Sequence, residues 1–465
     1  MFIILISILL AAAIPFFPED TLTILKIEVF LYLWIVIKDL MRTRRFTLLH
    51  TWEIAFIFII WSDMILCATD RNTYTLPIFF YTLANSLVLV GYFAHNKPSY
   101  SSRNMSSTYT EHKWGLLLVI ILCTILYLYY NYDKVLETLA FGRVLSKTLG
   151  SGSIMSTIIP ALGMLLPGII AYYIKYISKS WTGWAIILAT PIFIYQFIIA
   201  TRFQLLFQVF PFFIILGFIK IKNIDFKSIA FIVLFGIVLG WGSSYLKENR
   251  NYAVNETVLE EYTYTSDKRS DIFYNTAKEL SPEGIIGMMN IADDYYEDHN
   301  LEYGKESAYM LYFWVPRSLW PEKPTPIDHW LIRKYEVVED EHSASLGFLG
   351  FLRADFGWFA LLFSFIFGII IKRGDMYIRR VINNGMPAFD YVLAATLYPY
   401  IFFAVRSPQT ATQQLIFIFL IYLLFKLIFF NSSRGEYAET SSAIFPSPLD
   451  AFGIVPVLLA TNRQN

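Results

Sequence analysis

The sequence has few charged residues and almost no cysteine. Only 16% of its 465 residues are charged, and cysteine occurs twice, at Cys67 and Cys123. The two cysteines stand in different apolar runs without the spacing of a metal site or a redox pair, so we interpret them as small buried hydrophobes. The formal net charge is zero, and no basic patch interleaved with aromatic residues is present. Nucleic acid is therefore not an expected partner.

The common cofactor-binding motifs are also missing. The chain contains no Walker loop, no Gly-rich dinucleotide fingerprint, no HExxH and no GxSxG. Nothing therefore indicates ATP, a nicotinamide or a catalytic zinc, and we expect neither a cofactor nor a metal.

Hydrophobic residues make up 56% of the chain and aromatic residues 18%. Apolar runs of about the length that crosses a bilayer, roughly 17 to 25 residues, recur along it. The pattern predicts an all-α, polytopic membrane bundle of about twelve transmembrane helices with one large helical extracytoplasmic loop. The runs are 2–16, 22–37, 52–68, 76–93, 114–130, 154–174, 181–200, 203–219, 229–246, 346–371, 386–404 and 411–430.

The orientation follows from lysine and arginine in the short connections, because cationic loops stay in the cytoplasm. One alternate set is the richer: Lys38, Arg42, Arg44, Arg45, Lys97, Arg103, Lys113, Lys175, Lys179, Lys220, Lys222, Lys227, Lys372, Arg373, Arg379 and Arg380. The opposite set holds only Arg71, Lys134, Arg143, Lys147, Arg202 and Arg406. Both termini are thus predicted to be cytoplasmic. The first run lacks a basic start, so we expect an uncleaved helix, although "LLAAAIP" also offers a signal-peptide cleavage site.

No internal repeat divides the chain. We expect helices 1–9 in residues 1–244, an outer loop in 245–345, helices 10–12 in 346–430 and a cytoplasmic tail in 431–465. Residues 247–345 hold twenty acidic and ten basic residues, a composition that must be solvated or folded as a cap. "SDKRSDIFYNTAKEL", "SPEGIIGMMNIADDYYEDH" and "GKESAYMLYFW" are predicted helices, the second with Ser281 as its N-cap.

A proline-rich stretch, "WVPRSLWPEKPTPIDHW", follows these helices at residues 314–330. Prolines end the preceding helix and stiffen the loop, which would hold Arg317 and Lys323 at a fixed place beside the membrane. Trp314, Trp320 and Trp330 suit the membrane interface. The alternative is an interfacial anchor whose charges only touch lipid headgroups.

Two arginines stand at outer turns between apolar runs: Arg202 in "IIATRFQLLF" and Arg406 in "AVRSPQTATQQL". A third, Arg353 in "FLRADFGWFALL", stands inside or at the mouth of a span. Ionisable groups at membrane depth are expensive and usually face a cavity or a partner. The planar, bidentate guanidinium suits phosphate, so the set suggests a phosphate or pyrophosphate site. For Arg353, an ion pair with Asp355 or another acid is the alternative.

Histidines and acidic clusters of the outer loop offer further chemistry. His342, and less directly His329 and His299, could accept a proton from a sugar hydroxyl near neutral pH. The clusters "ADDYYEDHN" and "VEDEHS" could bind a divalent cation, or form solvated helix faces.

Three motifs resemble the Wzy-type oligosaccharide repeat-unit polymerases of O-antigen and capsule assembly. "ATRFQLLFQVF" is similar to the small-residue-plus-arginine helix start of the family, and "VPRSLWPEKPTP" to its proline-arginine loop. "LGFLGFLRADFGW" is similar to its glycine-aromatic segment after the large loop. One position departs from the pattern: Phe351 follows Gly350 where many members carry glutamate, which puts an acidic role there in doubt.

The resemblance implies a glycosyltransferase of the bacterial cytoplasmic (inner) membrane. It would transfer a glycan from polyprenyl pyrophosphate to the next lipid-linked repeat unit on the outer face, in contact with the lipid bilayer and with a polysaccharide chain-length regulator as a further partner. In this interpretation His342, Arg202 and Arg317 are catalytic. The cations on the pyrophosphate are Arg202, Arg317, Lys323, Arg353 and Arg406, and the sugar-contacting residues are Trp314, Trp320 and Trp330.

Two other classes stay open. A ligase that moves finished polysaccharide onto a lipid core or protein would share the large loop and the outer arginines. A twelve-helix flippase for the same lipid-linked sugars would have the same number of spans, although transporters often show paired repeats, which this chain lacks.

Overall fold

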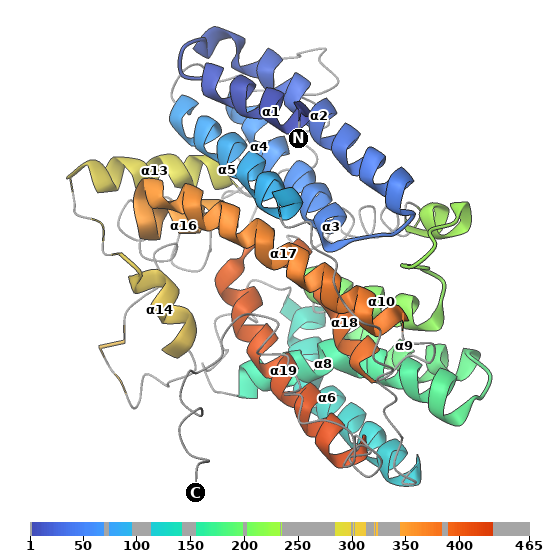
Figure 1. The fold of residues 1–465 in the computed structure, drawn as a ribbon. Helices are drawn as coiled ribbons and strands as arrows, with labels where there is room; N and C mark the ends of the chain where they lie inside the picture. The colour runs from blue at the N-terminus through green and yellow to red at the C-terminus, as the bar shows by residue number, and fades with distance from the viewer. Residues whose placement is uncertain are drawn as a thin grey trace, which may run out of the picture.

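The computed structural model describes residues 2–68, 74–94, 113–141, 155–198, 202–232, 234, 284–298, 301, 303–312, 320, 322–323, 345–383 and 389–430. Across these residues the regular structure is entirely helical, with no strand (Figure 1). The all-α prediction is therefore confirmed for the described part of the chain. An apolar chain in lipid must satisfy its backbone donors and acceptors internally, and the helix does so within one segment.

The first helices form one side of the bundle in Figure 1. Their bounds are α1 (Phe2–Ala13), α2 (Thr21–Thr43), α3 (Leu48–Ala55), α4 (Ser62–Ala68) and α5 (Thr75–Ala94). A π-helical turn at Phe56–Trp61 joins α3 to α4, so that 48–68 is one continuous rod.

The opposite side of the bundle is built from the middle and the end of the chain, and α17 lies between the two sides (Figure 1). These helices are α6 (Lys113–Phe141), α8 (Met155–Tyr172), α9 (Gly183–Ile198), α10 (Arg202–Leu216), α18 (Asp390–Arg406) and α19 (Pro408–Phe429). Within residues 245–345, the segment predicted as the large loop and called the large loop below, the structure describes α13 (Ile285–Asp298) and α14 (Lys305–Tyr312). The helices α16 (Gly347–Phe356) and α17 (Ala360–Asn383) follow this segment.

Six helical segments of the described residues are long and apolar enough to cross a membrane: Leu48–Ala68, Thr75–Ala94, Lys113–Leu136, Ile158–Ser178, Gly347–Asn383 and Pro408–Phe429. Three shorter apolar helices are Phe2–Ala13, Gly183–Ile198 and Leu205–Leu216. These segments fit a protein embedded in a lipid bilayer. The number of twelve spans stays a prediction.

Glycines allow α5 and α17 to pack with their backbones in contact. A Cβ on Gly368 would lie 2.1 Å from the Val88 carbonyl oxygen, and a Cβ on Gly91 would lie 2.0 Å from the Phe365 carbonyl oxygen. Small residues at a crossing permit this approach, which is a common way for helices to associate in lipid. The crossing fixes α17 against the first half of the chain.

The predicted span 346–371 is divided into two helices. Gly357 has a φ of 59°, in the left-handed region, and ends α16 before a short 3-10 turn starts α17. A residue with a Cβ adopts this conformation at a cost, which explains why glycine stands there. The break lets α16 turn toward the large loop.

Helix α13 starts at Ile285, three residues after the predicted start at Pro282. The carboxylate of Asp63 accepts the Ile286 N–H at 2.7 Å, so a side chain from α4 performs the capping that we assigned to Ser281. Ser281 itself lies outside the described residues, as do the predicted helix at 266–280 and the tail after residue 430.

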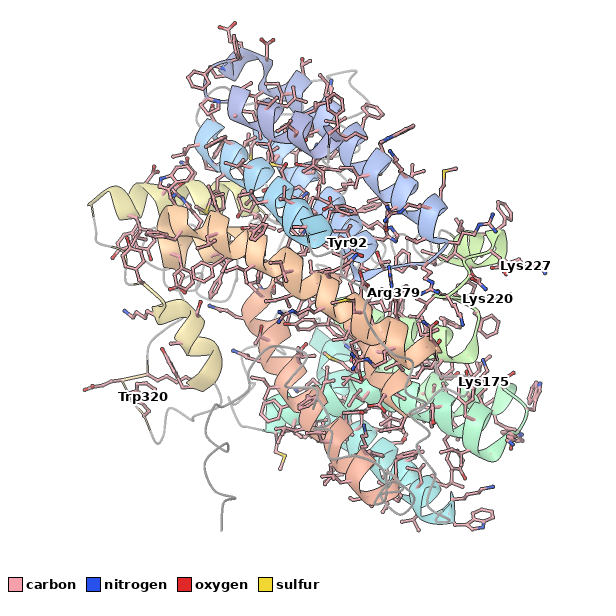
Figure 2. All side chains as sticks on the ribbon, viewed as in Figure 1. Tyr92, Lys175, Lys220, Lys227, Trp320 and Arg379 are labelled. Carbon is pink, nitrogen blue, oxygen red and sulfur yellow. The ribbon has the colours of Figure 1, made fainter. Side chains whose placement is uncertain are left out.

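The bundle has two chemically different ends. We call the end that carries α13, α14 and the start of α16 the loop end, and the end that carries Arg45, Lys175, Lys222 and Arg379 the basic end. Figure 2 shows Arg379, Lys220 and Lys175 on the side of the bundle away from Trp320. These three cations of the predicted cytoplasmic loops thus lie away from Trp320, and Arg45 and Lys222 line the same pocket as Arg379.

Candidate functional site

Of the arginines predicted to bind pyrophosphate, Arg353 and Arg406 lie at the loop end, and the backbone of Arg202 begins a helix that packs beside them. Arg406 is the last residue of α18, and Arg202 is the first residue of the antiparallel α10. The rings of Phe207 and Phe403 are 5.7 Å apart, which sets these two helix ends side by side. With a rise of about 1.5 Å per residue, Arg202 begins α10 within about two turns of that contact. The side chain of Arg202 lies outside the described part.

Arg353 is the best-defined cation of this site. Its Nε donates to Oδ1 of Asp293 at 3.2 Å, and its guanidinium lies 3.9 Å from the Trp358 ring centroid. The Arg353 side chain is only 10% exposed. The ion-pair alternative is thus realised with Asp293 of the large loop rather than with Asp355. Within the described residues, no hydrogen bond engages the two terminal Nη groups of Arg353, which can therefore still donate to an anion.

Asp355 instead fastens the second loop helix. Its Oδ2 accepts hydrogen bonds from the Ser307 backbone N–H at 3.0 Å and from the Ser307 hydroxyl at 2.5 Å. Ser307 lies in the first turn of α14, where a carboxylate satisfies a backbone donor that has no partner within the helix. The two acidic partners, Asp293 and Asp355, thus tie α13 and α14 to α16.

Aromatic residues of α14 hold the described part of the proline-rich stretch. The Lys323 ammonium lies 5.2 Å from the ring centroid of Tyr309, a cation–π arrangement. The ring of Trp320 is 5.1 Å from that of Tyr312. Lys323 is 8% exposed, whereas Trp320 is 37% exposed. Lys323 is therefore fixed near the loop end, and its neighbour Trp320 is the more exposed of the two.

Hydrogen bonds attach the start of α16 to α18 and α5. The Ser345 hydroxyl donates to the Arg406 carbonyl oxygen, and the Tyr81 hydroxyl donates to the Leu346 carbonyl oxygen at 2.5 Å. Gly347 follows with a φ of 62°. These bonds attach the loop to α18 and α5, so that Arg353 and Arg406 approach the same junction from different helices.

Comparison with protein-family models, with curated proteins and with solved structures finds no match to the chain. The geometry of the site and the sequence motifs are therefore the basis of any functional proposal.

Four predicted site residues lie outside the described part: His342, Arg317, Trp314 and Trp330. Among the described residues, no group of three or more His, Cys, Asp and Glu side chains is placed to hold a metal ion. Of the acidic cluster "ADDYYEDHN", Asp293 pairs with Arg353 and Asp294 is exposed.

Three residues of this site were missed from the sequence: Asp293 as the partner of Arg353, Trp358 as its stacking surface and Asp63 as the cap of α13. Asp63 gave a usable signal, because it is a carboxylate inside an apolar run and such residues are functional candidates. Asp293 and Trp358 gave no such signal in the sequence. Asp293 lies 60 residues before Arg353 and Trp358 lies 5 residues after it, and only the packing of the folded chain brings them into contact.

Proposed function

We propose that the chain is a membrane glycosyltransferase that polymerises lipid-linked oligosaccharide repeat units. The donor is a glycan on polyprenyl pyrophosphate, and the acceptor is a hydroxyl of the next lipid-linked unit. The reaction takes place at the loop end, which we assign to the outer face of the bacterial cytoplasmic membrane. There neither a nucleotide nor a cofactor is needed, because pyrophosphate is itself the activated leaving group.

The observation that carries the proposal is the meeting of cations at the loop end. Arg353 and Lys323 are held there by defined contacts, and α18 and α10 bring Arg406 and the start of α10 to the same end. The cations come from segments far apart in the sequence. Pyrophosphate is a multiply charged anion, and guanidinium groups bind its oxygens in the bidentate geometry they prefer.

The chemistry requires one bond to break and one to form at the anomeric carbon. The acceptor hydroxyl oxygen attacks that carbon and loses its proton to a base, for which His342 is our candidate. The C–O bond to pyrophosphate breaks, and its electron pair leaves on the polyprenyl pyrophosphate. The cations stabilise this growing charge, and one such donor is worth on the order of 3 kcal/mol in a protected site.

Exposed aromatic rings beside the cations fit the sugar part of the substrate. Trp320 is exposed and packs against Tyr312, and the Trp358 ring lies against the Arg353 guanidinium. The apolar faces of pyranose rings pack against such rings, while a polar loop surrounds the hydroxyls. This arrangement would orient the donor glycan so that its anomeric carbon faces the acceptor hydroxyl.

The test is complementation of a deletion strain of the native host, with surface and lipid-linked glycans separated on gels. Wild type is expected to restore a polymer ladder, whereas Arg202→Ala, Arg317→Ala and Arg353→Gln lose it at equal expression. Arg373→Ala removes an arginine from α17 near the basic end and serves as the matched control, which should restore the ladder.

Other results of this experiment would indicate a different function or refute the proposal. Full-length polymer stranded on its lipid carrier in the deletion strain would indicate the ligase class. Repeat units retained on the cytoplasmic side would indicate a flippase. An unchanged glycan profile, or a full ladder from all three variants, would refute the proposal.

A further inference from the structure

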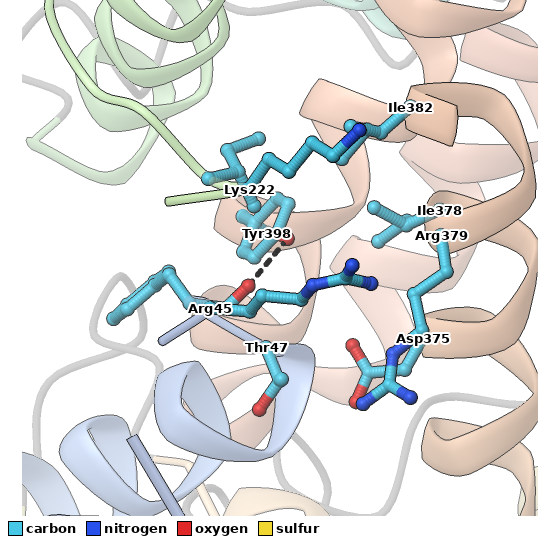
Figure 3. A pocket seen from close by; sticks show the side chains of 10 residues that line it. Arg45, Thr47, Lys222, Asp375, Ile378, Arg379, Ile382 and Tyr398 are labelled. Carbon is cyan, nitrogen blue, oxygen red and sulfur yellow. Dashed lines mark hydrogen bonds between the residues drawn. The ribbon is translucent and has the colours of Figure 1, made fainter. Parts of the chain in front are cut away.

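A pocket lies at the basic end, away from the site described above. It is lined by residues of two loops and two helices and opens to the solvent. Figure 3 shows Arg45 extending into it from the loop after α2 and Arg379 from α17, with Lys222 at its rim. Ile378 and Ile382, one turn apart on α17, form an apolar wall beside these charges.

Backbone hydrogen bonds fix the loops that build the pocket. The Phe46 N–H donates to the Ile221 carbonyl oxygen at 3.2 Å, and the Ile224 N–H donates to the Arg44 carbonyl oxygen at 3.1 Å. The Tyr398 hydroxyl donates to the Phe46 carbonyl oxygen at 2.9 Å (Figure 3). Segments almost 180 residues apart are thus joined, so the cations stand on a preorganised frame.

The acid of the pocket is already engaged. Asp375 accepts the Leu48 N–H on Oδ1 at 2.7 Å and the Tyr92 hydroxyl on Oδ2 at 2.6 Å. By contrast, Arg45, Lys222 and Arg379 form no ion pair within the part of the chain that the structure describes. Three cations face one carboxylate, which leaves the pocket with an excess of two positive charges.

Arg379 carries the clearest sign of a ligand. Its Nε is buried and has no hydrogen-bond partner among the described residues. Buried donors in proteins are nearly always paired, and an unpaired one calls for an explanation such as a bound ion. A phosphate oxygen would accept from this N–H, and the neighbouring arginine and lysine would neutralise its charge.

We propose that this pocket binds a phosphate group, with Arg45, Lys222 and Arg379 as its ligands. The phosphate can belong to an anionic lipid headgroup, whose first methylenes would meet Ile378 and Ile382, or to a soluble phosphate. Basic pockets between helices near the cytoplasmic face of a membrane suit either source. The inference stands independently of the glycosyl transfer proposed for the loop end.

The experiment uses the purified full-length protein in a nonionic detergent. Its thermal unfolding is followed in two titrations. The first compares phosphatidylglycerol with phosphatidylcholine, whose choline neutralises the phosphate. The second compares inorganic phosphate with chloride at equal ionic strength. Arg379→Gln and Lys222→Gln are each expected to lower the affinity for the ligand that stabilises the wild type, by about tenfold or more. This is the effect of losing one charge-assisted hydrogen bond. Lys222 is exposed, so its variant keeps the test valid if Arg379→Gln does not fold.

Matched controls remove the same charges outside the pocket. Arg373 lies on α17, and Lys227 lies near Lys222 in the sequence. The variants Arg373→Gln and Lys227→Gln should bind the ligand as tightly as the wild type does. Stabilisation by phosphatidylglycerol alone would identify a lipid headgroup, and stabilisation by inorganic phosphate would identify a soluble ligand. If neither stabilises the wild type, or if the control variants weaken binding as much as the pocket variants, the proposal is wrong.

Discussion

Arg353 and Asp293 connect the helical bundle to the segment predicted as the large loop through one ion pair. The Nε of Arg353 on α16 donates to Oδ1 of Asp293 on α13 at 3.2 Å, with the two side chains 10% and 15% exposed. The same guanidinium lies 3.9 Å from the Trp358 ring centroid. Asp293 therefore positions the arginine that we propose as a ligand of the pyrophosphate.

The first prediction separates the structural and functional roles of this pair. Asp293→Asn is expected to lower the free energy of unfolding by about 2 kcal/mol, because a nearly buried guanidinium loses its charged partner. Thermal unfolding in detergent, run as a double-mutant cycle with Arg353→Gln, measures the coupling. Asp294→Asn changes the exposed neighbouring acid and should have little effect. Additive effects of Asp293→Asn and Arg353→Gln would contradict the ion pair.

The second prediction concerns the start of α13. Asp63→Asn weakens the hydrogen bond to the Ile286 N–H and should cost about 1 kcal/mol, the usual worth of a helix cap. Amide hydrogen exchange across 285–298 is expected to quicken locally. Asp20→Asn is the control, because Asp20 precedes α2 without a side-chain capping bond. Unchanged exchange in α13 would rule out a capping role for Asp63.

The third prediction tests the crossing of α5 and α17. Gly368→Leu places a side chain where the Val88 carbonyl oxygen lies 2.1 Å from the Cβ position, so the two helices must separate. We expect a large loss of folded protein, measured as the monodisperse fraction in size-exclusion chromatography. Gly287→Ala is the matched control: its Cβ meets nothing within 4 Å, and alanine should stabilise α13 by about 1 kcal/mol. Normal yield of Gly368→Leu would show that the backbones do not touch.

The fourth prediction is a pH dependence at the basic end. Burial raises the pKa of Asp39, but this effect is outweighed by its contact with His50 at 3.3 Å and by Arg42 and Lys372, so the pKa falls below its usual 3.8. A carboxyl with a depressed pKa in the folded state stabilises the protein above its unfolded value, and this contribution is lost as the pH falls through the folded value. The melting temperatures of wild type and Asp39→Asn should thus differ at pH 6 and converge below about pH 4. A difference that does not change with pH would contradict the assignment.

The candidate site was partly predictable from the sequence. Arg353 and Arg406 were recognised because a permanent charge at the end of an apolar run is rare in lipid, and this signal needs no partner to be visible. The choice between Asp355 and Asp293 as the partner of Arg353 was not predictable. Asp355 is the nearer in sequence, but it lies two residues away on the same helix and does not face Arg353 across a turn, because helical neighbours are three or four residues apart.

The basic pocket shows a second limit. The sequence identified Arg45, Lys222 and Arg379 as cations of short loops and helix ends. Counting such cations predicted only which loops lie on the cytoplasmic side of the membrane. Their convergence depends on backbone hydrogen bonds between the loops after α2 and α10, which pair segments far apart in the chain.

The sequence by itself determined that this is an apolar, helical chain with a polar insertion and charged helix ends, because hydrophobic length and the need to satisfy backbone groups in lipid act within single segments. Tertiary structure alone decided which helices cross at Gly91 and Gly368, where α16 turns away from α17, and which acids hold Arg353 and α14. Such contacts depend on the shapes of surfaces brought together from distant parts of the chain, and no local pattern encodes them.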